Sequence, residues 1–212
     1  MKQTITVALI GGTGKSGQFL VKELLNKGFR LRLLLRSPKK FQITHSSIEI
    51  IEGDARRYES IRALVDSSQV VMSTLGQPKD EPPIFSQATA NVIRAMTACR
   101  IMRYILTTGL NVDSPGDRKS LSTQSATDWM KKNYPLTTAD KQIEFDLLSR
   151  SELNWTLVRL PLIELTEFRQ KIIVSLEDCP SDKIGASDLA HFLIEQLSGD
   201  QFIRKAPFIG NA

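Results

Sequence analysis

Short apolar runs alternate with amphipathic stretches of helical period along the first half of the chain. Residues 4–10 form an apolar, β-branched run, and residues 15–26 then repeat large apolar side chains at helical spacing before Gly28. The predicted strands are 4–10, 30–35, 48–51, 70–74 and 104–107, and the predicted helices are 15–26, 58–66 and 86–100. Each strand is followed by a helix-length connection, which requires parallel pairing through right-handed crossovers. We therefore predict an α/β fold with a doubly wound parallel sheet in three α/β/α layers.

The second half begins with a polar region and then returns to the same alternation. Residues 111–136 are rich in Ser, Thr, Asp and Lys, which predicts a flap over the sheet edge with a short helix at 127–133. Further predicted elements are a helix at 139–150, strands at 155–160 and 172–176, and a helix at 187–197 with Ser187 as its N-cap. No linker divides the chain, so we expect one domain over residues 1–212, with a short C-terminal extension at about 162–212.

Charge and cysteine content narrow the class of partner. The net charge of +5 comes from scattered Lys and Arg rather than from one basic block, so no nucleic-acid partner is expected. Cys99 and Cys179 stand alone, without the paired spacing of a metal site. With no signal peptide and no apolar run long enough to cross a bilayer, we expect a cytoplasmic protein without a membrane partner.

A glycine-rich turn connects the first strand to the first helix. The turn is Gly11, Gly12, Thr13, Gly14, Lys15, Ser16 and Gly17. In a G-x-x-G-x-x-G pattern the first glycine permits a tight turn, the second admits a pyrophosphate, and the third lets the helix pack on the strand. The N–H groups at the start of the helix then face the phosphates. This pattern predicts a dinucleotide site on a Rossmann fold.

The end of the same turn also imitates the phosphate-binding loop of nucleoside triphosphatases. That motif requires a glycine five residues before Gly14, where this chain has Leu9 inside the strand. The strand 70–74 also ends without an Asp to organise magnesium. A dinucleotide is therefore favoured over a triphosphate.

The residue at the end of the second strand distinguishes the two nicotinamide cofactors. An Asp or Glu there would accept hydrogen bonds from a free ribose 2′-hydroxyl, but this chain has Arg36, followed by Ser37 and Lys39. Positive charge and N–H donors suit a 2′-phosphate, which a carboxylate would repel. We expect NADP(H) to be preferred over NAD(H); a solvated basic turn would predict equal affinity.

Two further strand ends complete the expected cofactor site. Gly53, Asp54 and Ala55 follow the third strand, where Asp54 would meet the adenine amine or instead cap the next helix. Thr74, Leu75 and Gly76 end the fourth strand and are expected to line the passage to the nicotinamide ribose.

Read together, these segments resemble the atypical short-chain dehydrogenase/reductases, specifically the NmrA-like NAD(P)H-binding proteins and the biliverdin IXβ and flavin reductases. The resemblance rests on IGGTGKSG at 10–17, LLLRS at 33–37, EGDARR at 52–57, YILTTG at 104–109 and KQIEFDLLSRSELNWTLVRLP at 141–161. It covers nearly the whole chain, and it implies that Thr107, Lys141, Leu160, Pro161 and Leu162 also lie at the cofactor.

Members of this superfamily use a Tyr four residues before a Lys, with a Ser beyond the fifth strand, to move a proton at the substrate oxygen. Here Lys141 matches the Lys, but Thr137 stands at the Tyr position. Thr107 or Thr108 matches the Ser, and we take Thr108 and Lys141 as the candidate catalytic pair. The non-catalytic alternatives are that the threonine is simply a β-branched residue ending a strand and that Lys141 is a solvated helix residue.

The leading functional expectation is an NADPH-dependent oxidoreductase that reduces a small flavin-, quinone- or carbonyl-like acceptor. Hydride transfer can depend on positioning alone when water or substrate supplies the proton. Because the usual Tyr is missing, whether the protein is an enzyme at all stays open. The alternative is a non-enzymatic NADP(H)-binding redox sensor with a protein partner. A nucleotide-sugar epimerase or dehydratase would need that Tyr and a larger C-terminal domain.

Overall fold

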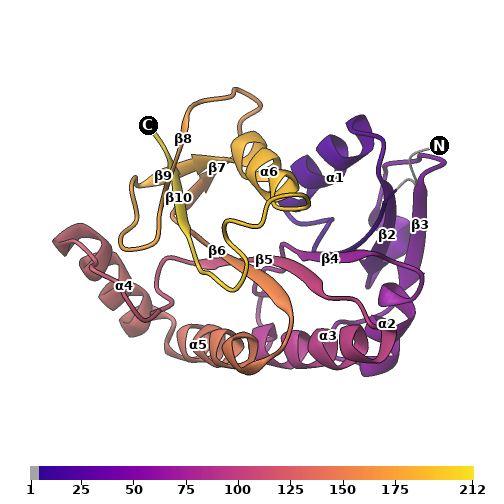
Figure 1. Ribbon diagram of the computed structural model, residues 1–212, viewed down its shortest axis with the longest axis horizontal. Helices are drawn as coiled ribbons and strands as arrows, with labels where there is room; N and C mark the ends of the chain where they lie inside the picture. The colour runs from indigo at the N-terminus through magenta and orange to yellow at the C-terminus, as the bar shows by residue number, and fades with distance from the viewer. Residues whose placement is uncertain (1–4) are drawn as a thin grey trace.

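The computed structural model describes residues 5–212, and its largest element is a sheet of eight strands in the order β3-β2-β1-β4-β5-β6-β10-β8 (Figure 1). These strands are β1 (Thr6–Ile10), β2 (Arg30–Leu35), β3 (Ile48–Glu52), β4 (Val70–Ser73), β5 (Arg103–Gly109), β6 (Asn154–Leu160), β8 (Ile172–Ser175) and β10 (Phe208–Asn211). Neighbouring strands pair in parallel except β10 and β8, which are antiparallel. The predicted doubly wound α/β sheet is confirmed, with one antiparallel strand added at its edge.

Helices cover both faces of the sheet. The helices on one face are α1 (Gly17–Asn26) and α6 (Ala186–Glu195), and those on the other are α2 (Tyr58–Val65), α3 (Phe85–Cys99) and α5 (Pro135–Arg150) (Figure 1). Consecutive residues of β1 serve opposite faces: Leu9 packs in the core with α1 and α6, whereas Ala8 packs in the core with α2, α3 and α5. A central parallel strand is buried on both sides, which is why β1 reads as an unbroken apolar run.

The strand order creates a crevice at the carboxyl ends of β1 and β4. From β1 the chain moves outward to β2 and β3, and it then returns to pair β4 on the opposite side of β1. Connections that leave these two strands diverge to opposite sides, which is where open α/β sheets bind ligands. The predicted glycine turn follows β1 and therefore lies at this crevice.

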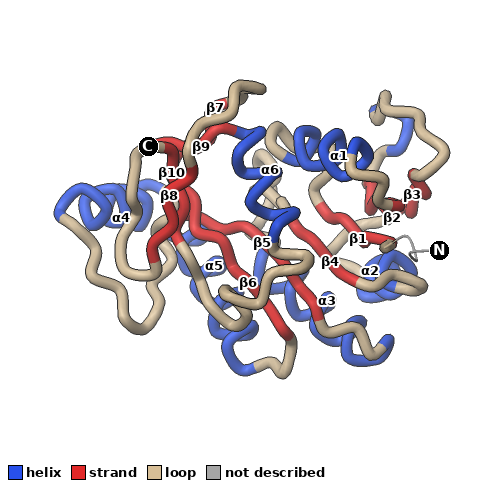
Figure 2. The backbone as a smooth tube through the Cα atoms, turned by 45° about the horizontal axis from the view of Figure 1, so that its top comes forward, coloured by secondary structure: helices blue, strands red, loops and turns tan. Residues whose placement is uncertain are grey.

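The polar region after β5 is more helical than its composition predicts. Helix α4 (Leu121–Asn133) begins six residues before the predicted 127–133 segment, and Ser120 caps it by accepting the Thr123 N–H at 3.4 Å. Figure 2 shows α4 at the opposite end of the molecule from α1 and β3. Helix α5 begins at Pro135, so the predicted start at residue 139 was wrong. A proline suits the first helical position, because no intrahelical partner is required of its nitrogen.

The last third of the chain contains short strands that carry little periodic signal. The unpredicted strands β7 (Leu162–Glu164) and β9 (Lys183–Gly185) form a separate parallel pair, and the unpredicted β10 lies between β6 and β8. The predicted N-cap Ser187 was wrong, because α6 begins at Ala186 with Gly185 as its N-cap. Thr4, predicted to open β1, lies outside the described residues.

Candidate functional site

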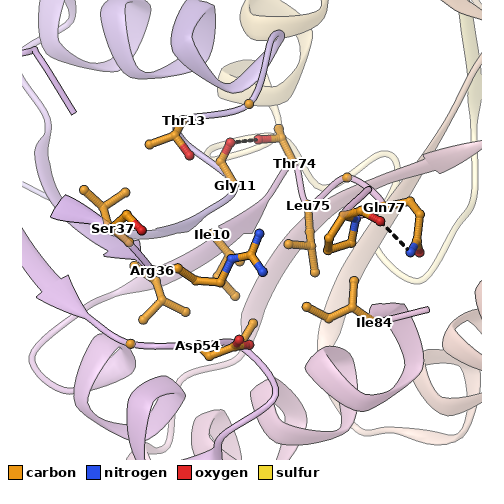
Figure 3. Close-up of a pocket in the computed structure, with 17 residues that line it drawn as sticks. Ile10, Gly11, Thr13, Arg36, Ser37, Asp54, Thr74, Leu75, Gln77 and Ile84 are labelled. Carbon is orange, nitrogen blue, oxygen red and sulfur yellow. Dashed lines mark hydrogen bonds between the residues drawn. The ribbon is translucent and has the colours of Figure 1, made fainter. Parts of the chain in front are cut away.

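The glycine turn is built by close backbone approaches that exclude side chains. Gly11 has φ +83°, and a Cβ there would lie 2.6 Å from the carbonyl carbon of Thr74. The Thr74 hydroxyl donates to the Gly11 carbonyl at 3.3 Å, which joins the ends of β1 and β4 (Figure 3). At Gly17 a Cβ would collide with that same carbonyl oxygen, so the third glycine lets α1 start against the turn.

The start of α1 is open to an anion. Among the described residues none caps this helix with its side chain, and Ser16 occupies the N-cap position. Gly14 donates its N–H to the Gly11 carbonyl at 2.9 Å and carries no side chain on the cavity side of the turn. Backbone N–H groups at an uncapped helix start bind phosphate groups. The turn therefore fits a pyrophosphate.

A cavity of about 510 Å³ opens beside this turn. It is lined by ten of the residues predicted from the sequence: Gly11, Thr13, Gly14, Arg36, Gly53, Asp54, Ala55, Thr74, Leu75 and Gly76 (Figure 3). Ser37, which the sequence analysis named beside Arg36, also lines it, and the other lining residues are Ile10, Leu34, Leu35, Gln77, Pro78 and Ile84. Most of these lie beside a predicted residue at a strand end, and Ile84 follows the prolines after β4. The segments at the ends of β1, β2, β3 and β4 converge here because parallel strands end at one edge of the sheet.

The remaining residues of the turn stand around the cavity rather than in its wall. Gly12 is buried, and a Cβ there would meet the Val21 side chain at 3.1 Å, so it supports packing of α1 on the sheet. Lys15 is exposed, and Ser16 and Gly17 form the start of the helix.

Asp54 lies at the cavity, as expected, but it does not cap helix α2. Its Oδ1 accepts the Arg56 N–H at 2.8 Å, which closes the turn ahead of α2, while the residue also lines the cavity. The N-cap of α2 is Arg57, so Asp54 stabilises the approach to the helix rather than its first turn.

Thr108 and Lys141 both lie near the carboxyl end of β5, and neither residue lines the cavity. The Thr108 hydroxyl is buried and has no hydrogen-bond partner among the described residues. The Lys141 ammonium group lies 4.9 Å from the centre of the Phe85 ring and close to Gly109, and burial lowers its pKa. Since buried polar atoms usually have partners, the orphaned Thr108 hydroxyl is a candidate for binding a ligand.

Asp140, which the sequence did not single out, positions Lys141. Its carboxylate accepts the Phe85 N–H at 2.8 Å and the Ser86 N–H at 3.2 Å, and it also binds the Ser86 hydroxyl. These bonds fasten α5 to the start of α3 one residue before Lys141. Only the packing of two helices distant in sequence reveals this role.

The other residues expected at the cofactor, Thr107, Leu160, Pro161 and Leu162, are not among the residues that line the cavity. Thr107 lies in β5 and is partly exposed, Leu160 is buried and pairs with Gly109, and Leu162 is 67% exposed beyond Pro161. At the α4–α5 junction Tyr134 packs edge-on against Trp129, with 5.7 Å between ring centres.

Comparison with known proteins assigns the chain to a family. The profile of a family described as NAD(P)H-binding matches residues 11–200, which include the glycine turn and the ends of β2, β3 and β4. The chain belongs to this NAD(P)H-binding family. Within residues 5–212 no helix is long and apolar enough to cross a membrane, and no cluster of His, Cys, Asp and Glu could hold a metal ion.

The curated relatives are distant and much longer. The protein TIC 62 of Arabidopsis thaliana chloroplasts is 27% identical over 140 residues, which cover 54% of this chain and 22% of the relative. Cinnamoyl-CoA reductase 1 of Arabidopsis thaliana is 24% identical over 117 residues, covering 50% of this chain and 34% of the relative. The chain therefore matches about a fifth to a third of the length of these relatives.

Solved structures match over nearly the full length. A short-chain dehydrogenase/reductase from Veillonella parvula in complex with NADP superposes with a TM-score of 0.80 and 17% identity, over 99% of this chain and 95% of that one. An oxidoreductase from Lactococcus lactis gives a TM-score of 0.77 and 15% identity, over 98% and 91% of the two chains. These structural similarities establish that this chain has a Rossmann-type fold.

Adding a methyl group at Gly17 should displace the turn and weaken cofactor binding. We expect Gly17→Ala to lower the free energy of unfolding by about 1–3 kcal/mol, since the new Cβ collides with the Gly11 carbonyl. Thermal unfolding and cofactor titration measure both effects. Gly76→Ala is the control for stability alone, because a Cβ there meets nothing within 4 Å but the residue lines the cavity. Equal stability of the two variants would contradict the packing role of Gly17.

Proposed function

We propose that this protein is an NADPH-dependent oxidoreductase that reduces a small flavin-, quinone- or carbonyl-like acceptor. The observation that carries the proposal is the position of Arg36, which follows β2 and lines the cavity beside Ser37. An adenosine ribose bound by the Rossmann turn has its 2′ position near the end of the second strand. A guanidinium group there binds a 2′-phosphate through charge-assisted hydrogen bonds.

The residues of this chain fit the rest of such a cofactor. The uncapped start of α1, next to Gly14 with no side chain in the way, would hold the pyrophosphate, and Asp54 and Ala55 would border the adenine. Thr74, Leu75 and Gly76 would lead toward the end of β5, where Lys141 would hold the nicotinamide ribose.

When bound, NADPH supplies a hydride to the acceptor. In the proposed reaction the orphaned Thr108 hydroxyl orients the acceptor oxygen or the nicotinamide amide. Thr137, at the position of the usual Tyr, cannot act as the acid, so a solvent proton completes the reduction of a carbonyl to an alcohol. The chain thus contributes orientation rather than a strong acid, which favours acceptors that do not require one.

Substitution of Arg36 tests the cofactor preference. We expect wild-type protein to bind NADPH more tightly than NADH, and Arg36→Asp to weaken NADPH binding by about tenfold or more, through loss of a charge-assisted hydrogen bond and added repulsion. Isothermal titration calorimetry with both cofactors measures the ratio of the two dissociation constants. Lys205→Asp makes the same charge change at an exposed position near the start of β10 and serves as control. Equal binding of NADPH by wild type and Arg36→Asp would contradict the proposal.

The absence of a Tyr at position 137 favours a second candidate, a non-enzymatic NADP(H)-binding sensor with a protein partner. The two functions separate in one assay: NADPH oxidation at high protein concentration with flavins, quinones, biliverdin and simple carbonyls. Turnover that falls in Thr108→Val identifies the oxidoreductase. Tight NADPH binding without turnover of any acceptor identifies the sensor.

A further inference from the structure

The carboxylate of Glu81 lies between two arginines that come from different parts of the sheet edge. Arg36 follows β2 and donates from Nη1 to Glu81 Oε1 at 2.8 Å. Arg56 belongs to the turn before α2, and its Nη1 lies 2.9 Å from Glu81 Oε2. Each carboxylate oxygen thus meets one guanidinium group, and the Arg36 hydrogen bond lowers the pKa of Glu81, so the group is an anion at neutral pH.

Arg56 is held more firmly than Arg36. Its side chain is 21% exposed against 50% for Arg36, and its Nη2 donates to the Pro82 carbonyl at 3.1 Å. Asp54 Oδ2 lies 3.6 Å from the same guanidinium group, and Asp54 Oδ1 accepts the Arg56 backbone N–H. Arg56 is therefore oriented in advance, whereas Arg36 is free to turn with its ligand.

Arg36 also extends over the space that a cofactor would use. Figure 3 shows its guanidinium group directed from β2 across the cavity toward Leu75. The loop that carries Glu81 is fixed at its base, because Gln77 Nε2 donates to the carbonyls of Pro78 and Glu81 at 3.0 and 2.8 Å. The Glu81 side chain can thus release the arginines through rotation, without movement of the whole loop.

We propose that Arg36 and Arg56 together form the binding site for the 2′-phosphate of NADPH, and that the Glu81 carboxylate occupies this anion position until the phosphate replaces it. The inference rests on the proposed NADPH preference and assigns two residues that Arg36 alone does not imply. A phosphate has more oxygens and more charge than a carboxylate, so it satisfies the same pair of guanidinium groups. NADH has no anion at this point and leaves the Glu81 contacts in place.

An ordinary surface ion pair is the competing explanation. Exposed pairs contribute about 0–1 kcal/mol and have no relation to a ligand. Substitution of Glu81 or Arg56 would then leave the ratio of NADPH to NADH affinity unchanged, whereas a shared anion site requires opposite changes in the two variants.

The test is titration of wild type, Glu81→Gln and Arg56→Gln with NADPH, NADH and 2′-AMP, an adenosine probe that carries the phosphate alone. We expect Glu81→Gln to bind NADPH and 2′-AMP several-fold more tightly, and Arg56→Gln to bind them about tenfold more weakly, with NADH affinity changed less than about twofold in both. Asp80→Asn and Arg57→Gln neutralise an exposed acidic and an exposed basic neighbour, and both variants should match wild type.

The outcomes separate this inference from the proposed function. If wild type prefers NADPH and Arg36→Asp removes the preference, while Glu81→Gln and Arg56→Gln match wild type, only the two-arginine site is overturned. If Glu81→Gln improves NADPH and NADH equally, Glu81 obstructs the cavity without mimicking the phosphate, and the inference is wrong. Equal affinity of wild type for both cofactors would overturn the proposed preference itself.

Discussion

Replacing Asp117 by alanine is expected to lower the free energy of unfolding by about 3–5 kcal/mol, because it leaves the guanidinium group of Arg159 charged and unpaired inside the protein. The Arg159 side chain is 0% exposed, and its Nη1 donates to both carboxylate oxygens of Asp117, at 2.8 and 2.7 Å. Removal of one partner from a buried ion pair exposes the full desolvation cost of the other. Urea unfolding followed by circular dichroism measures the loss.

The remaining contacts of Arg159 explain why it cannot move to water instead. It donates to the carbonyls of Val112, Ala206 and Leu176 at 3.2, 2.8 and 3.3 Å, and its guanidinium carbon lies 3.5 Å from the centre of the Phe208 ring. One side chain thus links β6 to the region after β5, to the residue that follows β8 and to β10.

Asp128→Ala is the matched control for Asp117→Ala. Asp128 is exposed on α4 and only accepts a bond from Gln124, so its loss should change the free energy of unfolding by less than about 0.5 kcal/mol. A similar small effect in Asp117→Ala would show that Arg159 does not need its partner.

The second large effect concerns pH. Glu144 on α5 is 4% exposed, and burial raises its pKa to about 7 from the ordinary 4.5, although the Thr89 hydrogen bond of 2.8 Å and the charge of Lys141 oppose the rise. The folded protein therefore binds this proton more tightly than the unfolded chain does. The stabilisation is complete below the unfolded pKa and is lost as the pH rises through the folded pKa.

We therefore expect Glu144 to make the protein less stable by about 3 kcal/mol at pH values above 7 than at acidic pH, and Glu144→Gln to remove this dependence. Denaturant unfolding at a series of pH values tests it. Gln retains the shape and can accept the Thr89 bond without a charge. Glu152→Gln, at an exposed position just after α5, should retain the wild-type profile. A wild-type pH profile in Glu144→Gln would refute the assignment.

The first half of the fold could be predicted because each local signal there agrees with the final packing. The β1 strand is apolar on both faces, and the three spaced glycines after it leave few alternatives for the turn. The later strands could not be predicted from the sequence, and the reason is physical. A strand of three or four residues such as β7 or β10 has no period to detect, and its partners are fixed by distant contacts.

The same distinction applies to the candidate site. Strand ends such as Gly11, Thr74 and Gly53 are predictable, because parallel strands deliver them to one edge of the sheet. The pairing of Glu81 with Arg36 and Arg56 is not, since each residue belongs to a different connection and is individually an ordinary surface charge. The role of a charged side chain in a loop can be inferred only from its neighbours in the folded structure.

The insertion of β10 between β6 and β8 also constrains the order in which the chain can assemble. β8 joins the main sheet only through β10, although it precedes β10 by more than thirty residues. The backbone of residues 204–208 pairs with β6, so during synthesis the β6 edge stays open until these residues emerge from the ribosome. An exposed edge strand invites pairing with another chain. Nascent chains stalled before residue 204 should consequently depend on chaperones far more than the folded chain does.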